Sequence, residues 1–254
     1  MKEFDLTVAL TAHSETLVAG PTMRSAEIAI RIAEAAGFRI ERLIGLDAPS
    51  DEGRAFFCQP AFANWRVEKF QSLDPYPTRN ALAERASGRW VAFLDADDLF
   101  SENWLVAAGE CLIEAEKANG KVIVHPEMHW VFDNDALVFT KPAQDDPLFV
   151  PEHFYVANYY DMLCMAPREA YRDVPYVSRD LVNGFGYGDW QWNIETMAAG
   201  WRHVVAKDTI IFKRRRDYSV VLQNEARQTV IFHVESMAID RVRKLGRSPE
   251  GLAL

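Results

Sequence analysis

Short apolar segments alternate with helical stretches through the first half of the chain. Residues 6–10, 40–46 and 89–94 are apolar runs of strand length, and residues 25–36 and 77–86 between them carry helical patterns. Strands that alternate with helices in this way predict βαβ units. We therefore expect an α/β fold with a mixed, mostly parallel central sheet that is flanked by helices.

Polar loops follow three of the expected strands, at residues 11–15, 47–51 and 95–98. In open α/β sheets, ligands bind past the carboxyl ends of the strands. Because parallel strands end at the same edge of a sheet, we expect these three loops to form one binding edge.

The second half of the chain lacks this regular alternation. We expect there strands at 122–124, 137–139 and 204–212, a glycine-rich loop at 183–188 that leads into a helix at 189–199, and a last helix at about 228–244. No linker is long enough to separate two domains, so we expect a single domain over residues 1–254.

Charge limits the partners that the chain can have. It carries 28 Lys and Arg against 37 Asp and Glu, a formal net charge of −9. This balance argues against a protein that binds nucleic acid by neutralising its phosphates. An anionic ligand would need a metal ion or a local basic cluster, and residues 213–216, Lys-Arg-Arg-Arg, form such a cluster.

Cysteine usage and the lack of targeting signals bear on the compartment. Cys58, Cys111 and Cys164 are far apart and have no zinc-site spacing, which favours a reduced chain with buried thiols. No apolar run approaches the ~20 residues that span a bilayer, and residues 1–5 lack the order of a signal peptide. We expect a cytoplasmic protein, and contact with the inner face of the membrane stays open.

An acidic cluster follows the apolar run 89–94. Asp95, Asp97 and Asp98 place three carboxylates within four residues, where they repel one another unless a divalent cation or hydrogen-bond donors hold them. Mg²⁺ and Mn²⁺ favour oxygen ligands and share them with phosphates. The alternative is an acidic turn before a helix, with Asp98 and Ser101 as caps.

The run of residues 78–98 resembles the central signature of family 2 glycosyltransferases, which reads Arg-Asn, a helix, Ala-x-Gly, an apolar strand and Asp-x-Asp-Asp. Residues 10–15, Leu-Thr-Ala-His-Ser-Glu, are similar to the first-strand loop of the family, and residues 46–51 to its second-strand Asp-x-x-Ser-x-Asp turn. Residues 186–192, Gly-Tyr-Gly-Asp-Trp-Gln-Trp, stand where the family carries Glu-Asp-Trp-Asp at the head of a helix.

The resemblance implies the GT-A fold and inverting transfer of a sugar from a nucleotide-diphosphate donor to a hydroxyl of a glycan or lipid-linked acceptor. It divides the domain into a nucleotide-sugar-binding half at about 1–120, an acceptor-binding half at about 121–225, and a C-terminal helix and tail at about 226–254. It assigns donor binding to Thr11, Glu15, Asp47, Arg79, Asp95, Ala96 and Arg214.

Two of these roles have a physical reason in the residue type. The carboxylate of Asp47 would accept a hydrogen bond from the base, which fits the N–H of uracil and points to a UDP-sugar. Arg79 would contact the base or the diphosphate, because the helix dipole otherwise opposes a cation at a helix start. The alternatives are a turn-forming aspartate, a surface salt bridge for Arg79, and a solvated or lipid-contacting basic patch at 213–216.

The same resemblance implies which residues bind the metal ion and which residue is the general base. Asp97 would bind Mn²⁺ or Mg²⁺ directly, and His203 would be a third ligand unless it is an ordinary half-buried strand residue. Asp189 would be the general base that takes the acceptor proton, unless it only caps its helix. We place Tyr187 and Trp190 near the acceptor, since the glycine-rich loop should hold them at the pocket mouth.

One departure favours a rival function. Gly188 replaces the glutamate that usually precedes the catalytic aspartate, so a supporting carboxylate is missing. The alternative is a catalytically lost relative that binds nucleotide-sugar without turnover.

Overall fold

The computed structural model describes residues 3–217 and 219–246. Its strands are β1 (Phe4–Ala12), β2 (Ile40–Asp47), β3 (Arg66–Phe70), β4 (Gly88–Asp95), β5 (Leu99–Phe100), β6 (Val122–Asp133), β7 (Leu137–Thr140), β8 (Met165–Pro167) and β9 (Arg202–Arg215). Its α-helices are α1 (Thr16–Ala35), α2 (Asp51–Phe57), α3 (Pro75–Arg85), α4 (Trp104–Lys117), α5 (Arg168–Asp173), α6 (Gly188–Ala198), α7 (Val220–Ala226) and α8 (Ile239–Val242).

The strands form one mixed sheet with the order β3-β2-β1-β4-β8-β6-β9-β5, and β7 pairs with β6 outside this path. The four strands from β3 to β4 are all parallel. Strand β8 is antiparallel to β4 and to β6, so β6 runs in the direction of β4, and β9 is parallel to β6. The ends of β1, β2, β4, β6 and β9 therefore lie along one edge, as the sequence predicted for the first three.

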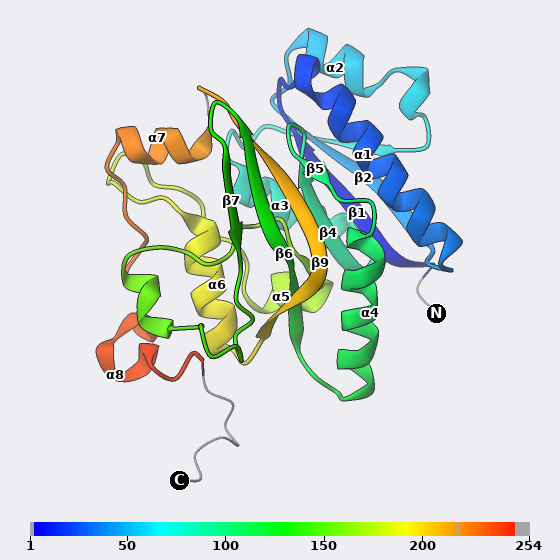
Figure 1. The fold of residues 1–254 in the computed structure, drawn as a ribbon. Coiled ribbons are helices and arrows are strands. Elements are labelled where there is room, and N and C mark those ends of the chain that lie inside the picture. The colour runs from blue at the N-terminus through cyan, green and yellow to red at the C-terminus, as the bar shows by residue number, and fades with distance from the viewer. Residues whose placement is uncertain (1–2, 218, 247–254) are drawn as a thin grey trace.

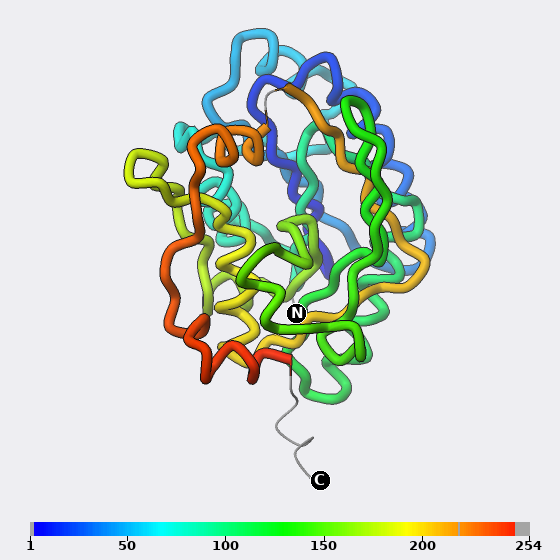
Figure 2. Tube along the Cα trace, turned by 60° about the vertical axis from the view of Figure 1, so that its left-hand side comes forward, coloured from blue at the N-terminus to red at the C-terminus, as the bar shows by residue number. Residues whose placement is uncertain are grey.

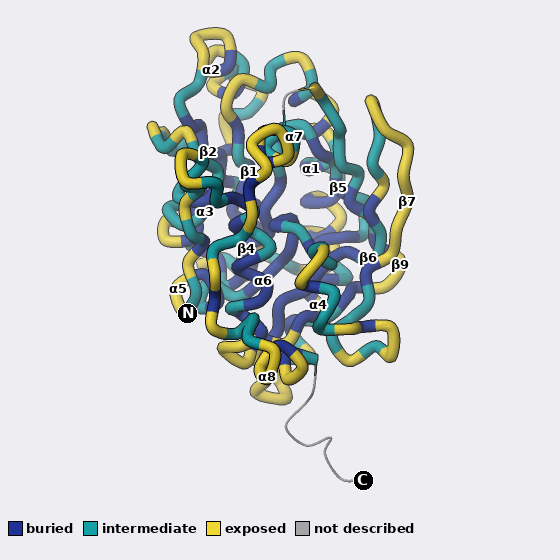
Figure 3. The backbone as a smooth tube through the Cα atoms, turned by 90° about the vertical axis from the view of Figure 1, so that its left-hand side faces the viewer, coloured by how far each residue is buried: buried dark blue, intermediate teal, exposed yellow. Residues whose placement is uncertain are grey.

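Helices cover both faces of this sheet (Figure 1). Helices α1 and α4 pack together on one face, and α3, α5 and α6 lie on the other. The core between them is apolar, and its interior strands are buried while α2, β7 and α8 are exposed at the periphery (Figure 3). Continuous apolar strands of this kind are what a sheet buried on both faces requires.

A second, smaller core lies under the C-terminal segment. That segment runs along α6, as the orange-to-red part of the tube shows (Figure 2), and Val234, Val242 and Leu245 pack there against Ile194 and Met197 of the helix. Because these side chains are buried in this cluster, the segment is part of the fold.

The expected helix at 228–244 is wrong. Residues 229–234 are not helical, and they are followed by a short 3-10 turn at Glu235–Met237 and the brief helix α8. Gln228 has a positive φ of 51°, which stops α7 from continuing, and Val230 then forms a parallel bridge to Phe185. The β-branched and aromatic residues at 230–234 suit extended backbone better than helix. The tail at 247–254 lies outside the described residues.

Other element boundaries also differ from expectation. Helix α1 begins at Thr16, nine residues before the expected start at 25, because Gly20 and Pro21 concealed its first turns. Strand β9 extends to Arg215, so most of the basic cluster is strand rather than loop. Cys164 is buried and Cys111 half-buried as expected, but Cys58 is exposed, because it follows the end of α2 at the surface.

Candidate active site

The carboxyl ends of β1 and β4 meet through three side chains. Thr11 Oγ1 donates to Asp95 Oδ1 at 2.5 Å, and the guanidinium of Arg79 pairs with the same carboxylate oxygen. Arg79 is fully buried, so the ion pair is needed to offset the cost of removing its charge from water. Its Nε and Nη1 have no hydrogen-bond partner among the described residues.

Asp97 faces the end of β9. Arg216 Nη2 lies 2.5 Å from Asp97 Oδ2 and 3.5 Å from Glu15 Oε1. Burial, followed by the charge of Asp95, raises the pKa of the Asp97 carboxyl. The ionised form of Asp97 is therefore held at a cost that only a nearby cation can offset.

Asp98 has a different environment from its two neighbours. It is buried, accepts a hydrogen bond from the backbone N–H of Arg214 at 2.8 Å, and lies 3.2 Å from the ammonium of Lys213. Burial raises the pKa of the Asp98 carboxyl to about 7. Asp98 thus ties the β4 turn to β9. It does not cap α4, which begins at Trp104, while Ser101 instead accepts from the Ile210 N–H.

The basic cluster lies at this same edge because β9 runs parallel to β6. Arg214 Nη1 is 2.8 Å from Asp133 Oδ2, and its guanidinium lies over the Phe132 ring. Arg215 lies 3.6 Å from Asp135. The cations thus meet acidic partners from β1, β4 and β6, at the edge where we expected a diphosphate.

Asp47 and Ala96, the other two residues that the sequence assigned to donor binding, make hydrogen bonds that hold loops in place. Asp47 Oδ1 accepts from the Ser72 backbone N–H at 2.6 Å, and the Asp47 carbonyl lies 2.5 Å from His13 Nδ1. Ala96 is buried, and its carbonyl accepts from Thr22 Oγ1 at 3.1 Å. Both residues lie at the edge, and Ala96 acts there through its backbone.

Helix α3 contacts both Asp189 and Asp95, which lies at the end of β4. Tyr76 and Arg79 are three residues apart and share a helix face. The Tyr76 hydroxyl donates to Asp189 Oδ1 at 3.2 Å, while Arg79 pairs with Asp95. Asn158 Nδ2 lies 3.5 Å from Asp189 Oδ2. Burial, and then the charge of Asp161, raises the pKa of the Asp189 carboxyl.

The structure explains why residue 188 is glycine. A Cβ placed on Gly188 would lie 2.9 Å from the ring of Tyr76 and 2.9 Å from the Val177 carbonyl oxygen. No glutamate fits there without displacing Tyr76. The Tyr76 ring therefore packs against Gly188, and its hydroxyl donates a hydrogen bond to Asp189.

Tyr187 and Trp190 flank this carboxylate. Tyr187 precedes α6 with a left-handed φ of 54°, and its ring meets that of Trp190 edge-on at 6.0 Å between centroids. Both side chains are partly exposed. Within the part of the chain that the structure describes, the Trp190 indole N–H has no protein acceptor.

His203 is not brought to this site. It lies at the start of β9, paired in register with Ile123, and Lys213 is ten residues further on, about 30 Å away at the rise of a strand. Its Nε2 lies 3.0 Å from Thr196 Oγ1 and its Nδ1 2.9 Å from His125 Nε2. The proposed role as third metal ligand is therefore corrected: His203 is a buried core histidine.

This burial predicts acid sensitivity. Burial lowers the pKa of His203 to about 3, below its ordinary 6.5. Between these values the unfolded chain binds a proton that the folded chain does not, so the free energy of unfolding falls as pH falls, by about 1.4 kcal/mol per pH unit for this residue. Urea unfolding of the wild type and of H203Q, from about pH 7 to about pH 5, should show this contribution as the difference between their slopes. A slope that H203Q leaves unchanged would contradict the assignment.

Sequence reasoning missed two contributors. Tyr76 stands three residues before Arg79, a spacing that could have placed both on one helix face. Asp161 is held by His129, Lys141 and Lys213, partners that no local pattern connects.

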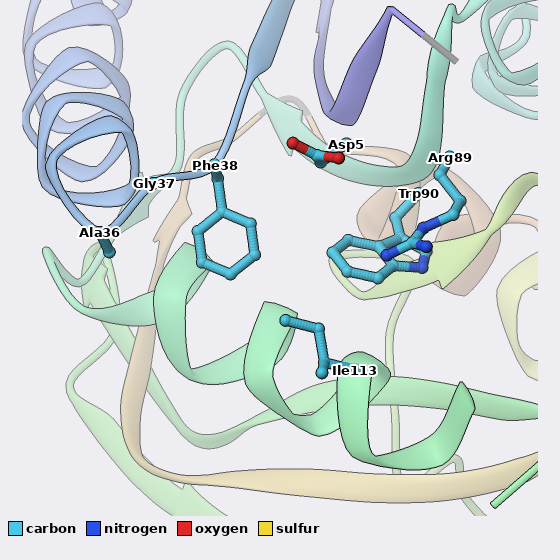
Figure 4. Close-up of a pocket in the computed structure, with 7 residues that line it drawn as sticks. All are labelled: Asp5, Ala36, Gly37, Phe38, Arg89, Trp90 and Ile113. Carbon is cyan, nitrogen blue, oxygen red and sulfur yellow. The ribbon is translucent and has the colours of Figure 1, made fainter. Parts of the chain in front are cut away.

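A pocket of about 220 Å³ lies at the opposite edge of the sheet (Figure 4). Phe38, Trp90 and Ile113 line it, with Asp5 and Arg89 at the starts of β1 and β4. It is therefore separate from the carboxylate edge.

No helix of the described residues is long and apolar enough to cross a membrane.

Carboxylates and a buried arginine lie past the ends of parallel strands, which is where open α/β sheets bind their ligands. Residues 64–144 match the family model of glycosyl transferase family 2, which confirms the resemblance predicted from the sequence. The matched segment contains Arg79, Asp95 and Asp97. Residues 64–144 are thus similar in sequence to family 2 glycosyltransferases. The sequence matches no curated protein.

Solved structures show the same fold. Residues 1–349 of TarS from S. aureus, in complex with UDP-GlcNAc, superpose with a TM-score of 0.62 at 13% identity, covering 86% of this chain and 60% of that one. The complex of the same TarS residues with UDP gives 0.59 at 14% identity, covering 91% and 68%. The expected GT-A fold is confirmed, and the chain spans 60% of the first of these chains.

Proposed function

We propose that the protein is an inverting glycosyltransferase that moves a sugar from a UDP-sugar to a hydroxyl of a glycan or lipid-linked acceptor, within a single domain. One observation carries the proposal. Helix α3 presents Arg79 to Asp95 and Tyr76 to Asp189, so a donor-side carboxylate and an acceptor-side carboxylate converge on one helix end.

The donor would bind across the ends of β1, β2 and β4. Thr11 and Glu15 lie at and after the end of β1, and Asp47 lies at the end of β2. Asp95 lies at the end of β4, and Arg79 reaches it from α3. Arg214 and its neighbours on β9 would meet the diphosphate, since cationic side chains suit phosphate oxygens. The TarS structures that share the fold contain UDP and UDP-GlcNAc, which supports the choice of donor.

A divalent cation fits this edge only together with the donor. In the described parts, 3–217 and 219–246, no three His, Cys, Asp or Glu side chains form a ready-made metal site. Asp97, partly exposed and paired with Arg216, would hold Mn²⁺ or Mg²⁺ with phosphate oxygens, which is the usual sharing for these ions. Such an ion would stabilise charge on the leaving diphosphate.

Asp189 would act as the base in a single displacement. Its carboxylate accepts the acceptor's hydroxyl proton as the oxygen attacks the anomeric carbon, the bond to the diphosphate breaks, and the configuration inverts. A raised pKa brings a carboxylate closer to the value that suits general-base work near neutral pH. Tyr187 and Trp190 would contact the acceptor sugar.

A relative that binds nucleotide-sugar without turnover is the rival, and Gly188 is the feature that favours it. The contact between Tyr76 and Asp189 weakens that argument, because the phenol supplies the support that a glutamate would give. The two functions differ in one measurable respect, since only the enzyme releases UDP in the presence of an acceptor.

Thermal unfolding with UDP, GDP, CDP and dTDP, each with and without Mn²⁺, tests the donor. Ligand at about 100 times its dissociation constant should stabilise the fold by about 2.7 kcal/mol, and we expect this for UDP with Mn²⁺. A rise in unfolding temperature with another nucleotide instead would mean that the donor carries that nucleotide and not UDP. No shift at saturation with any of them would overturn the proposal, and binding without UDP release from UDP-sugars across an acceptor panel would favour the rival.

A further inference from the structure

The segment 158–161 joins the two halves of the candidate site. Asp161 is largely buried and receives three nitrogen groups: His129 Nε2 at 2.9 Å, Lys141 Nζ at 3.5 Å and Lys213 Nζ at 3.5 Å. These partners come from β6, from the residue that follows β7, and from β9. Three residues earlier, Asn158 contacts Asp189.

Lys213 links Asp161 to the donor side of the candidate site. Its ammonium lies 3.2 Å from Asp98 and 3.5 Å from Asp161, so one cation bridges two carboxylates. Asp98 in turn accepts from the backbone of Arg214. Without Asp161, nothing among the described contacts holds Lys213 on its far side, and the end of β9 would lose one of its anchors beside the acidic cluster.

Asn158 links the turn that contains Asp161 to the acceptor side of the candidate site. This side chain contacts Asp189 Oδ2 at 3.5 Å and accepts from Asn193 Nδ2 at 3.2 Å. Asp161 fixes the same turn, since its Oδ1 also accepts from the Leu163 N–H at 3.0 Å. The negative charge of Asp161 acts on Asp189 as well.

We infer that Asp161 is a positioning residue that couples Asp98, in the acidic cluster after β4, to the acceptor-side carboxylate Asp189, by holding Lys213 on one side and by anchoring the turn that carries Asn158. This inference rests on the proposed function for its catalytic meaning. Asp161 touches neither substrate in this arrangement and acts through its neighbours. Lys141 and His129 are the groups that keep its carboxylate buried and ionised.

The proposal predicts the sign of a change in the pKa of Asp189, which a merely structural role for Asp161 would not predict. Asp161 and burial raise the pKa of Asp189, whereas Lys213 and the Tyr76 hydrogen bond lower it. The titratable and charged groups that face Asp189 are Tyr76, Arg79, Asp161, Tyr176, Tyr187 and Lys213. Removing the Asp161 charge releases Lys213 on one side only, because its contact with Asp98 at 3.2 Å remains. The loss of the repulsion from Asp161 should therefore lower the pKa of Asp189.

The experiment compares D161N with the wild type in transfer and in titration. We expect kcat to fall about 10- to 100-fold, the scale of a small misplacement of reacting groups, with the KM for the donor little changed. The acid limb of the kcat/KM profile should move to lower pH. Carbon NMR of the labelled Asp189 carboxyl, assigned with D189N, should show the same shift without any need for turnover.

Two further variants separate positioning from loss of the fold. D161N leaves the Lys141 ammonium buried without its carboxylate, so D161N/K141M should recover stability while transfer stays slow and the pKa of Asp189 stays low. The matched control is D173N, a half-exposed carboxylate that pairs with Lys121 at 3.4 Å, which should change neither readout.

The outcomes are distinct for the two proposals. An unchanged Asp189 titration in D161N, or full recovery of transfer in D161N/K141M, overturns the role of Asp161. A wild-type protein that binds donor without turnover overturns the enzymatic function, and the NMR shift still decides whether Asp161 sets the charge of Asp189.

Discussion

Replacing Asp189 with asparagine is expected to slow sugar transfer by about 10² or more, the usual scale for loss of a general base, while UDP binding stays nearly unchanged. Asparagine keeps the shape of the side chain and an oxygen that can accept from Tyr76. It removes only the proton acceptor. Because the described side-chain partners of Asp189 are Tyr76 and Asn158, whereas Asp95 pairs with Arg79, the loss of the Asp189 carboxylate should not disturb the nucleotide contacts.

The measurement is transfer kinetics with UDP release as a function of pH. Burial raises the pKa of Asp189 above its ordinary 3.8, so the wild type should lose kcat/KM as pH falls through that raised value, and D189N should lack this acid limb. E195Q is a matched control, since Glu195 is a half-buried carboxylate on the same helix whose pKa burial also raises. Transfer by D189N within tenfold of the wild type would remove Asp189 from the role of base.

The parallel half of the fold follows from local sequence pattern. Strands such as 40–46 are continuous apolar runs, and a sheet that is buried on both faces requires such runs. Since parallel strands share an edge, the loops after them could be placed together before any contact was known. The carboxylates Asp95, Asp97 and Asp98 were found in this way.

The remainder depends on contacts that sequence spacing does not encode. Tyr76 and Asp189 are separated by 113 positions, and the partners of Asp161 come from several strands. The stretch after Gln228 was predicted as a helix, but Val230 bridges to Phe185 and Val234 packs in the second core, contacts that local sequence does not reveal. His203 was misplaced for the same reason: its residue type suits a metal, but its position in β9 does not.

Replacing Asp97 with alanine is expected to abolish the Mn²⁺-dependent part of UDP binding without unfolding the protein. In the wild type, burial and Asp95 raise the pKa of Asp97, and Arg216 supplies countercharge. A divalent ion shared with the diphosphate would supply more, and removing its protein ligand should weaken UDP binding by about 100-fold or more, the upper range seen when even supporting groups of a metal site are lost. The fold should survive because Arg216 keeps its contact with Glu15.

Titration of UDP by calorimetry, with Mn²⁺ and with chelator, gives the comparison. The wild type should bind more tightly with Mn²⁺, and D97A should bind equally with and without it. D135A is the matched control, because Asp135 pairs with Arg215 at the same edge but stands outside the acidic cluster; its Mn²⁺ dependence should persist. If D97A kept that dependence, the ion would have other ligands and Asp97 would serve only to hold Arg216. If neither protein responded to Mn²⁺, the cations of β9 would remain the groups at this edge able to offset charge on the departing diphosphate.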